Sequence, residues 1–188
     1  HVVFCKQPIE IVASETVRQA GTTLLQRWPL VCAIRDRRFA NNLQEFVLVA
    51  AHLPPASRRF ERDAQIKAII NSYAKETALR LNRPFDLKGA RDARRPPVAH
   101  IIAADFNAFV GACEYQAREN GFETAVGAKV PTSVSGSALD NFLYSCFLKD
   151  VCSVAAEVLE LALPQNSARK RIGVSDHSPI LLRIRETG

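Results

Sequence analysis

Two stretches decide the fold of this chain: VLVAAHLPP at 47–55 and VAHIIAADFNA at 98–108. Each begins with an apolar run of strand length, and each run ends in a polar residue that a turn signal follows. Apolar runs without polar alternation are typical of strands that are buried on both faces of a sheet. Both stretches therefore predict central strands of a layered domain, with His52 and Asp105 at the strand ends.

Further short apolar runs predict more strands around these two. They lie at 1–5, 9–13, 30–34, 139–144 and 180–184. The helical spacing of apolar residues predicts a long helix over 57–81, and a shorter one is expected over 112–120. Strands mixed with helices indicate a layered α/β or α+β domain, and 188 residues suffice for one such domain with a sizeable core.

The longer helix is predicted to pack one face into the core. Ile66 and Ile70 lie on its apolar face, whereas Arg62 and Lys67 are assigned elsewhere on the helical wheel. Ser57 is the predicted N-cap, because a serine hydroxyl can accept a hydrogen bond from a backbone N–H group of the first turn. We therefore expect this helix to be a packing element rather than part of a cofactor site.

The composition limits the partners. The chain has 25 Lys and Arg against 19 Asp and Glu, and the net charge of +6 favours an anionic partner such as nucleic acid, phospholipid or an acidic protein. Two predicted exposed loops, 83–98 and 164–173, carry much of the basic surplus. No apolar run approaches the roughly 20 residues that a membrane span needs. Five Cys without zinc-ligand spacing favour reduced thiols and an intracellular location.

Four polar clusters stand where predicted strands begin or end. They are His52, the pair Asp105 and Asn107, Asp140, and the pair Asp176 and His177. Burying a charge is costly unless it is paired, so such positions are poorly suited to stability alone. A rigid scaffold could instead present these groups together to a substrate. Taken singly, Asn and Asp also end strands without any further role, which is the alternative interpretation of each cluster.

The same residue types suit the hydrolysis of a phosphodiester. Carboxylates with an Asn can orient or deprotonate water, and a His with a divalent cation can neutralise charge on the phosphorus oxygens. A carboxylate can also fix the tautomer of a catalytic imidazole. Hard oxygen ligands without a Cys/His cluster favour Mg²⁺ or Mn²⁺ over Zn²⁺.

Four segments in a fixed order carry a family resemblance. VAAHLPP, IIAADFNA, SALDNFLYS and GVSDHSPILL resemble the four C-terminal motifs of the endonuclease/exonuclease/phosphatase family, with the deoxyribonuclease I branch nearest. The likeness covers nearly the whole chain, from about residue 3 to 184. It implies a four-layered α/β sandwich of two packed mixed sheets, formed by residues 1–188 as one domain without its N-terminal part. It also implies a divalent-metal-dependent nuclease that hydrolyses phosphodiester bonds of DNA or RNA.

The resemblance implies a catalytic role for five residues. Asp105 and Asn107 match the pair that positions or deprotonates the attacking water, and His52 matches a histidine that holds a phosphate oxygen. Asp140 matches the carboxylate that orients the last histidine, which is His177 here. We therefore expect a hydrogen bond between Asp140 and His177, although 37 positions separate them, and we expect the site residues to line one cleft at the ends of two facing sheets.

The resemblance also implies contacts to metal and phosphate. Asp176 matches a metal ligand, and Arg27 in QRWPLVCAI matches, less closely, an arginine that grips substrate phosphate. Family members begin with a strand carrying an Asn and with a metal-binding Glu, and neither precedes residue 3. We therefore expect an upstream segment or a partner chain to complete the metal site, and we expect His52 to lack its acidic partner. The 188 residues alone are expected to hydrolyse nucleic acid poorly or not at all.

Two other functions stay open. Phosphatases and phospholipases C share the fold and act on inositol phosphates or sphingomyelin, although the inositol phosphatases carry a PAWCDR-like motif where this chain has SALDNFLYS at 137–145. A degenerate member could instead serve as a structural or RNA-binding subunit of a larger assembly. The retained DFN and SDH triplets argue against degeneration, and the missing upstream ligands argue for it.

Overall fold

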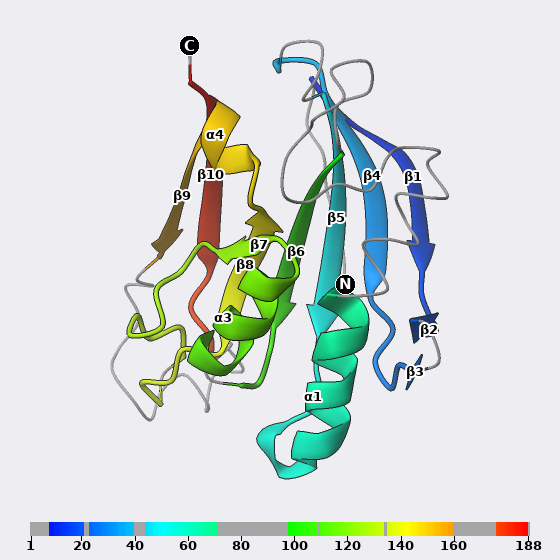
Figure 1. Ribbon diagram of the computed structural model, residues 1–188, viewed down its shortest axis with the longest axis vertical. Coiled ribbons are helices and arrows are strands. Elements are labelled where there is room, and N and C mark those ends of the chain that lie inside the picture. Colours follow the sequence, from blue (N-terminus) through cyan, green and yellow to red (C-terminus); the bar gives the residue numbers. More distant parts are fainter. Residues whose placement is uncertain are drawn as a thin grey trace.

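The computed structural model describes residues 8–20, 23–39, 44–70, 98–108, 110–133, 135–159 and 176–187. Several predicted segments lie outside these residues: the strand at 1–5, the distal part of the long helix from residue 71, residues 83–97 of the first basic loop and the second basic loop at 164–173. The described residues form two packed sheets, a short hairpin and a few helices (Figure 1).

The larger sheet has six strands in the order β1-β4-β5-β6-β8-β7. Their bounds are β1 (Ile9–Thr16), β4 (Leu30–Asp36), β5 (Glu45–His52), β6 (Ala99–Asp105), β8 (Asp140–Ser145) and β7 (Phe122–Thr124). β5 and β6 are parallel and all other neighbours are antiparallel, so this sheet is mixed. The two apolar runs that predicted central strands form β5 and β6 at the centre of the sheet.

The smaller sheet has two antiparallel strands, β9 (Cys152–Val158) and β10 (Ile180–Glu186). A hairpin pairs β2 (Gln19–Ala20) with β3 (Thr23–Leu24). The helical elements are η1 (Ala56–Arg58), α1 (Arg59–Ala68), α3 (Val110–Glu119) and α4 (Leu148–Val151). None of the helices in the described residues has the length and apolar character that crossing a membrane requires.

Successive residues of the central strands alternate between two cores. Val47 and Ile102 belong to the core between the larger sheet and the helices α1 and α3, which lie over the same face of that sheet in Figure 1. Phe46 and Ile101 point to the opposite face and belong to the core that includes residues of β9 and β10. Both faces are thus covered by apolar layers, which explains why the two runs lack polar alternation. This packing of helices on a sheet that packs on a second sheet is the predicted α/β sandwich; within the described residues the smaller sheet consists of one antiparallel pair.

The first helix differs from its prediction in two respects. Ser57 lies within η1, and Arg58 is the residue that precedes α1 without any side-chain capping bond, so the predicted N-cap is wrong. Ile66 and Ile70 are buried as predicted, but Arg62 is only 8% exposed. Arg62 stands four residues before Ile66, on the same helical face. Its guanidinium donates a hydrogen bond to the backbone carbonyl of Asn107.

Candidate active site

The register of β5, β6 and β8 sets three of the predicted site residues side by side. His52 is the cross-strand partner of Asp105, and Asp105 is the partner of Asp140. Directly opposed residues project to the same face of a sheet. His52 and Asp105 lie an even number of residues from Phe46 and Ile101, so all three polar side chains project toward the smaller sheet.

His52 has an acidic neighbour within the described residues. Its Nε2 atom lies 3.4 Å from Oδ2 of Asp105. The expectation of a His52 without an acidic partner is therefore wrong. The resemblance implied an acidic partner only from an upstream segment. The parallel pairing of β5 with β6 instead places Asp105, at the end of β6, beside His52.

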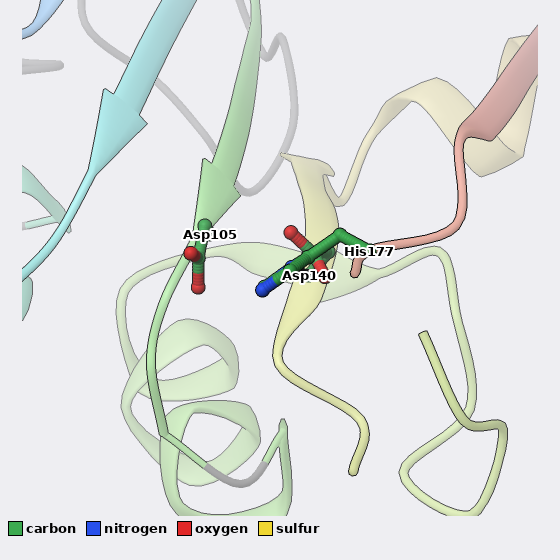
Figure 2. A group of neighbouring side chains, drawn as sticks. All are labelled: Asp105, Asp140 and His177. Atoms are coloured by element: carbon green, nitrogen blue, oxygen red, sulfur yellow. Dashed lines mark hydrogen bonds and ion pairs between the residues drawn. The ribbon is translucent and has the colours of Figure 1, made fainter. Parts of the chain in front are cut away.

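His177 reaches the same place from the smaller sheet. It lies three residues before β10, and its Nδ1 atom is 2.7 Å from Oδ2 of Asp140, so the predicted hydrogen bond is confirmed. Figure 2 shows the side chains of Asp105, Asp140 and His177 directed toward one another between the strand ends. The pair of Asp140 and His177 therefore links the two sheets at the site.

Burial and neighbouring charges shift two pKa values of the site. Burial raises the pKa of Asp105; the hydrogen bond from the Asn107 backbone lowers it, the charge of Asp140 raises it further, and the net shift is upward. Burial alone would lower the pKa of His177, but the hydrogen bond and charge of Asp140, with the charges of Asp105 and Asp176, raise it above its ordinary value. A carboxylate that takes up a proton more readily suits a general base, and an imidazole whose protonated form is favoured suits a phosphate contact.

Asn107 sits in a left-handed turn that hydrogen bonds hold from three sides. Its φ is +48°, a conformation that Asn adopts more readily than most residues. Its backbone N–H donates to Oδ1 of Asp105 at 2.9 Å, and its Nδ2 donates to the carbonyl of Leu53 at 2.9 Å. Arg62 donates to the carbonyl of Asn107 at 2.7 Å. The Nδ2 contact leaves Oδ1 of Asn107 as the acceptor that can face a water or a cation.

Two residues of this site were missed by the sequence analysis. Arg62 supports the turn at Asn107, and its spacing of four from Ile66 was a signal that could have placed it on the buried face. Thr132 is fully buried, and its hydroxyl donates to Oδ2 of Asp140 at 2.9 Å. The same hydroxyl oxygen accepts the backbone N–H of Asp140 at 3.0 Å. Nothing in the polar segment around Thr132 marks it in the sequence, because its partner is set by tertiary packing.

Arg27 and Asp176 lie at the margins of the cluster. Nη1 of Arg27 donates to the carbonyl of Leu53 at 3.3 Å, the same oxygen that accepts from Asn107. Asp176 is exposed, and its Oδ1 atom is 3.9 Å from Nε2 of His177. Both residues are thus near the site, and their roles toward phosphate and metal stay predictions.

Three side chains could hold a metal ion. Asp105, Asp140 and His177 each offer one ligand atom, and these atoms lie within 4.8 Å of one another. The carboxylate oxygens suit Mg²⁺ or Mn²⁺, while Nδ1 of His177 is already engaged by Asp140. A cation would also offset the repulsion between Asp140 and Asp105 that contributes to the raised pKa of Asp105. The donor set therefore fits a divalent cation held mainly by oxygen.

The chain has the fold of the endonuclease/exonuclease/phosphatase proteins. The catalytic domain of human Nocturnin, solved with a bound sulfate anion, superposes with a TM-score of 0.62 at 18% identity, over 95% of this chain and 60% of that one. An endonuclease/exonuclease/phosphatase family protein from Bacteroides thetaiotaomicron gives 0.57 at 14% identity, over 94% and 65% of the two chains. ANGEL2, a 2′,3′-cyclic phosphatase in complex with adenosine-2′,3′-vanadate, gives 0.50 at 11% identity, over 95% and 68%.

The chain thus spans between 60% and 68% of the length of these solved structures. No protein-family model matches the sequence, and no curated protein matches it either.

Proposed function

We propose that this protein is a divalent-metal-dependent hydrolase of phosphodiester bonds in DNA or RNA. The observation that carries the proposal is the convergence of His52, Asp105, Asp140 and His177, which come from separate elements and meet where the two sheets end. The shared fold supports it, because one structural neighbour is a 2′,3′-cyclic phosphatase. The net charge of +6 suits a polyanionic substrate.

Each residue of the proposed mechanism acts through its own chemistry. Asp105 accepts a proton from the attacking water, which Oδ1 of Asn107 orients. The water oxygen bonds to phosphorus while the P–O bond to the leaving sugar oxygen breaks, and that oxygen takes a proton from solvent. His177, whose protonated form Asp140 stabilises, donates from Nε2 to a phosphate oxygen that gains charge in the transition state. His52 binds a second phosphate oxygen.

A divalent cation is the remaining part of the proposed site. When bound, it would supply charge neutralisation at the phosphorus oxygens. Asp105, Asp140 and the exposed Asp176 are the carboxylates that would hold it. We also propose that upstream residues strengthen this binding, so that the 188-residue chain alone hydrolyses nucleic acid weakly.

The test is hydrolysis of labelled DNA and RNA oligonucleotides in Mg²⁺ or Mn²⁺, with EDTA as the blank. The 188-residue chain is assayed beside the same chain extended upstream. Asp105→Asn is expected to lower the rate by about 10²–10⁴-fold, the range for loss of a general base. The matched control is Asp150→Asn, which removes an exposed carboxylate in α4. Equal rates for the two variants, or no hydrolysis by either chain, would refute the proposal.

A second readout comes from stability. Because burial raises the pKa of Asp105, the ionised form of this carboxyl destabilises the folded state. The loss of stability is fully present once the pH exceeds the pKa of Asp105 in the folded state. Asp105→Asn keeps an acceptor oxygen for the backbone of Asn107 and removes the charge. We expect this variant to be more stable at pH 8 by about 0.5–2 kcal/mol, as is common where a functional site opposes stability. Chemical denaturation measures the difference.

A further inference from the structure

An exposed aromatic residue lies on the segment that joins β3 to β4. Trp28 is the one tryptophan of the chain and is 47% exposed. The guanidinium carbon of Arg18 lies 4.4 Å from the centroid of its ring. Backbone bonds hold the two residues together, since the N–H of Val17 donates to Pro29 at 3.0 Å and the N–H of Leu25 donates to Arg18 at 2.8 Å. These bonds therefore fix the strand ends that carry the ring and the cation relative to each other.

The segment between β3 and β4, residues 25–29, is called the aromatic segment, and a hydrogen bond joins it directly to the site. Arg27, next to Trp28 in the chain, donates to the carbonyl of Leu53 at 3.3 Å. Asn107 donates to the same oxygen at 2.9 Å. A single backbone oxygen thus connects the aromatic segment with the residue that we propose to orient the attacking water.

A second exposed ring lies on the neighbouring helix start. Gln26 donates to the carboxylate of Glu61, and Arg58 donates to Oε1 of Gln26 at 3.0 Å. Phe60, between these two helix residues in the chain, is 91% exposed. The aromatic segment therefore docks against a helix end that presents another apolar ring.

The charge and the exposed rings together indicate the ligand. Residues 17–29 contain two arginines and no carboxylate. Arginine pairs well with phosphate, and aromatic rings stack on bases that have no partner strand to stack within. A duplex keeps its bases inside and would use only the arginines.

We propose that Trp28, with Arg18 beside it, is a stacking platform for a single-stranded nucleic acid whose phosphodiester lies at the site. The proposal rests on the proposed function for its location only, since base stacking needs neither the metal nor the chemical step. It assigns the protein a preference for unpaired strands over duplexes.

The test is binding in EDTA, where hydrolysis is blocked. A short single-stranded oligonucleotide should quench the fluorescence of Trp28 and should bind more tightly than its duplex. Trp28→Leu should weaken single-strand binding about fivefold to a hundredfold, measured by the anisotropy of a labelled oligonucleotide. Trp28→Phe, which keeps a ring, should restore part of this loss.

The matched control is Tyr115→Leu, which removes a ring that is 68% exposed on α3. It should leave binding unchanged, and circular dichroism should show equal unfolding midpoints for all variants. Unchanged Trp28 fluorescence at high oligonucleotide concentration, equal losses in the two leucine variants, or tighter duplex binding would each overturn the platform. Equal hydrolysis rates for wild type and Trp28→Leu would overturn the stacking platform and leave the proposed function standing. Stacking on Trp28 without any hydrolysis would refute the proposed function and leave the platform standing.

Discussion

The two sheets of this protein differ in how deeply their strands are buried. In β5 and β6 every residue is buried or half-buried except His52, at the end of β5. In β9 and β10 exposed residues recur at about every second position. Apolar layers cover both faces of the larger sheet, whereas the smaller sheet buries one face in the described residues. The difference shows that one half of the site rests on a rigid centre and the other half on a less buried element.

The site residues divide in the same way. His52, Asp105 and Asp140 lie on neighbouring strands of the larger sheet, so backbone pairing fixes their spacing. His177 comes from the segment before β10 and reaches the cluster through its bond with Asp140. The geometry of the site therefore depends on how the smaller sheet docks on the larger one.

Truncating one isoleucine in each sheet should give the largest contrast. Ile102→Ala in β6 removes a side chain that is almost fully buried, and we expect it to lower the free energy of unfolding by about 2–5 kcal/mol. Ile184→Ala in β10 removes a half-buried side chain and should cost about 1 kcal/mol. Denaturant unfolding measures both. Equal losses would mean that the smaller sheet is as deeply packed as the larger one.

Removing the buried arginine should have the next largest effect. Arg62→Met leaves the carbonyl of Asn107 without its donor, and an unsatisfied buried group costs about 1–3 kcal/mol. The hydrolysis rate should fall with it, because the turn at Asn107 loses support. The control is Arg59→Met on the same helix, where an exposed ion pair with Asp63 contributes at most about 1 kcal/mol. Similar losses of stability and of hydrolysis rate in both variants would show that Arg62 does not support the site.

The hydroxyl of Thr132 offers a smaller test of the link between the sheets. Thr132→Val keeps the shape and removes the hydrogen bond to Asp140, so we expect a loss of about 1–2 kcal/mol. The titration of His177, followed by NMR, should shift as well, because its partner is no longer fixed. Thr132→Ser keeps the hydroxyl and should leave that titration unchanged. A titration that is identical in all three proteins would contradict the proposed support of Asp140.

The pH dependence of the cross-sheet pair should be the smallest effect. Because the pKa of His177 is raised in the folded state, its contribution to stability is fully present below its unfolded pKa of about 6.5. The contribution is lost as pH rises through the folded pKa. We therefore expect wild type to exceed His177→Gln in stability by a few tenths of a kcal/mol more at pH 5.5 than at pH 9, the scale of a partly exposed ion pair. An equal difference at both pH values would show that the pair is not charged.

The sequence patterns predicted the buried centre better than the periphery. The runs in 47–52 and 99–105 were found because both faces of those strands are apolar. β9 was missed, since its sequence CSVAAEV mixes small and charged residues and buries only one side. The helix start was also misassigned, because η1 takes up Ser57 before α1 begins. Arg62 was predicted to lie away from the apolar face of the helix because it is charged. Its spacing of four from Ile66 indicates the buried face, where it lies.

The sequence by itself determined which strands are central and which polar residues stand at their ends, because burial on both faces leaves a continuous apolar pattern. Tertiary structure alone decided which of these residues become neighbours. The pairing of His52 with Asp105, the bond of Thr132 to Asp140 and the approach of His177 all depend on strand order and register. Those are set by contacts between distant segments, and residue periodicity carries no information about them.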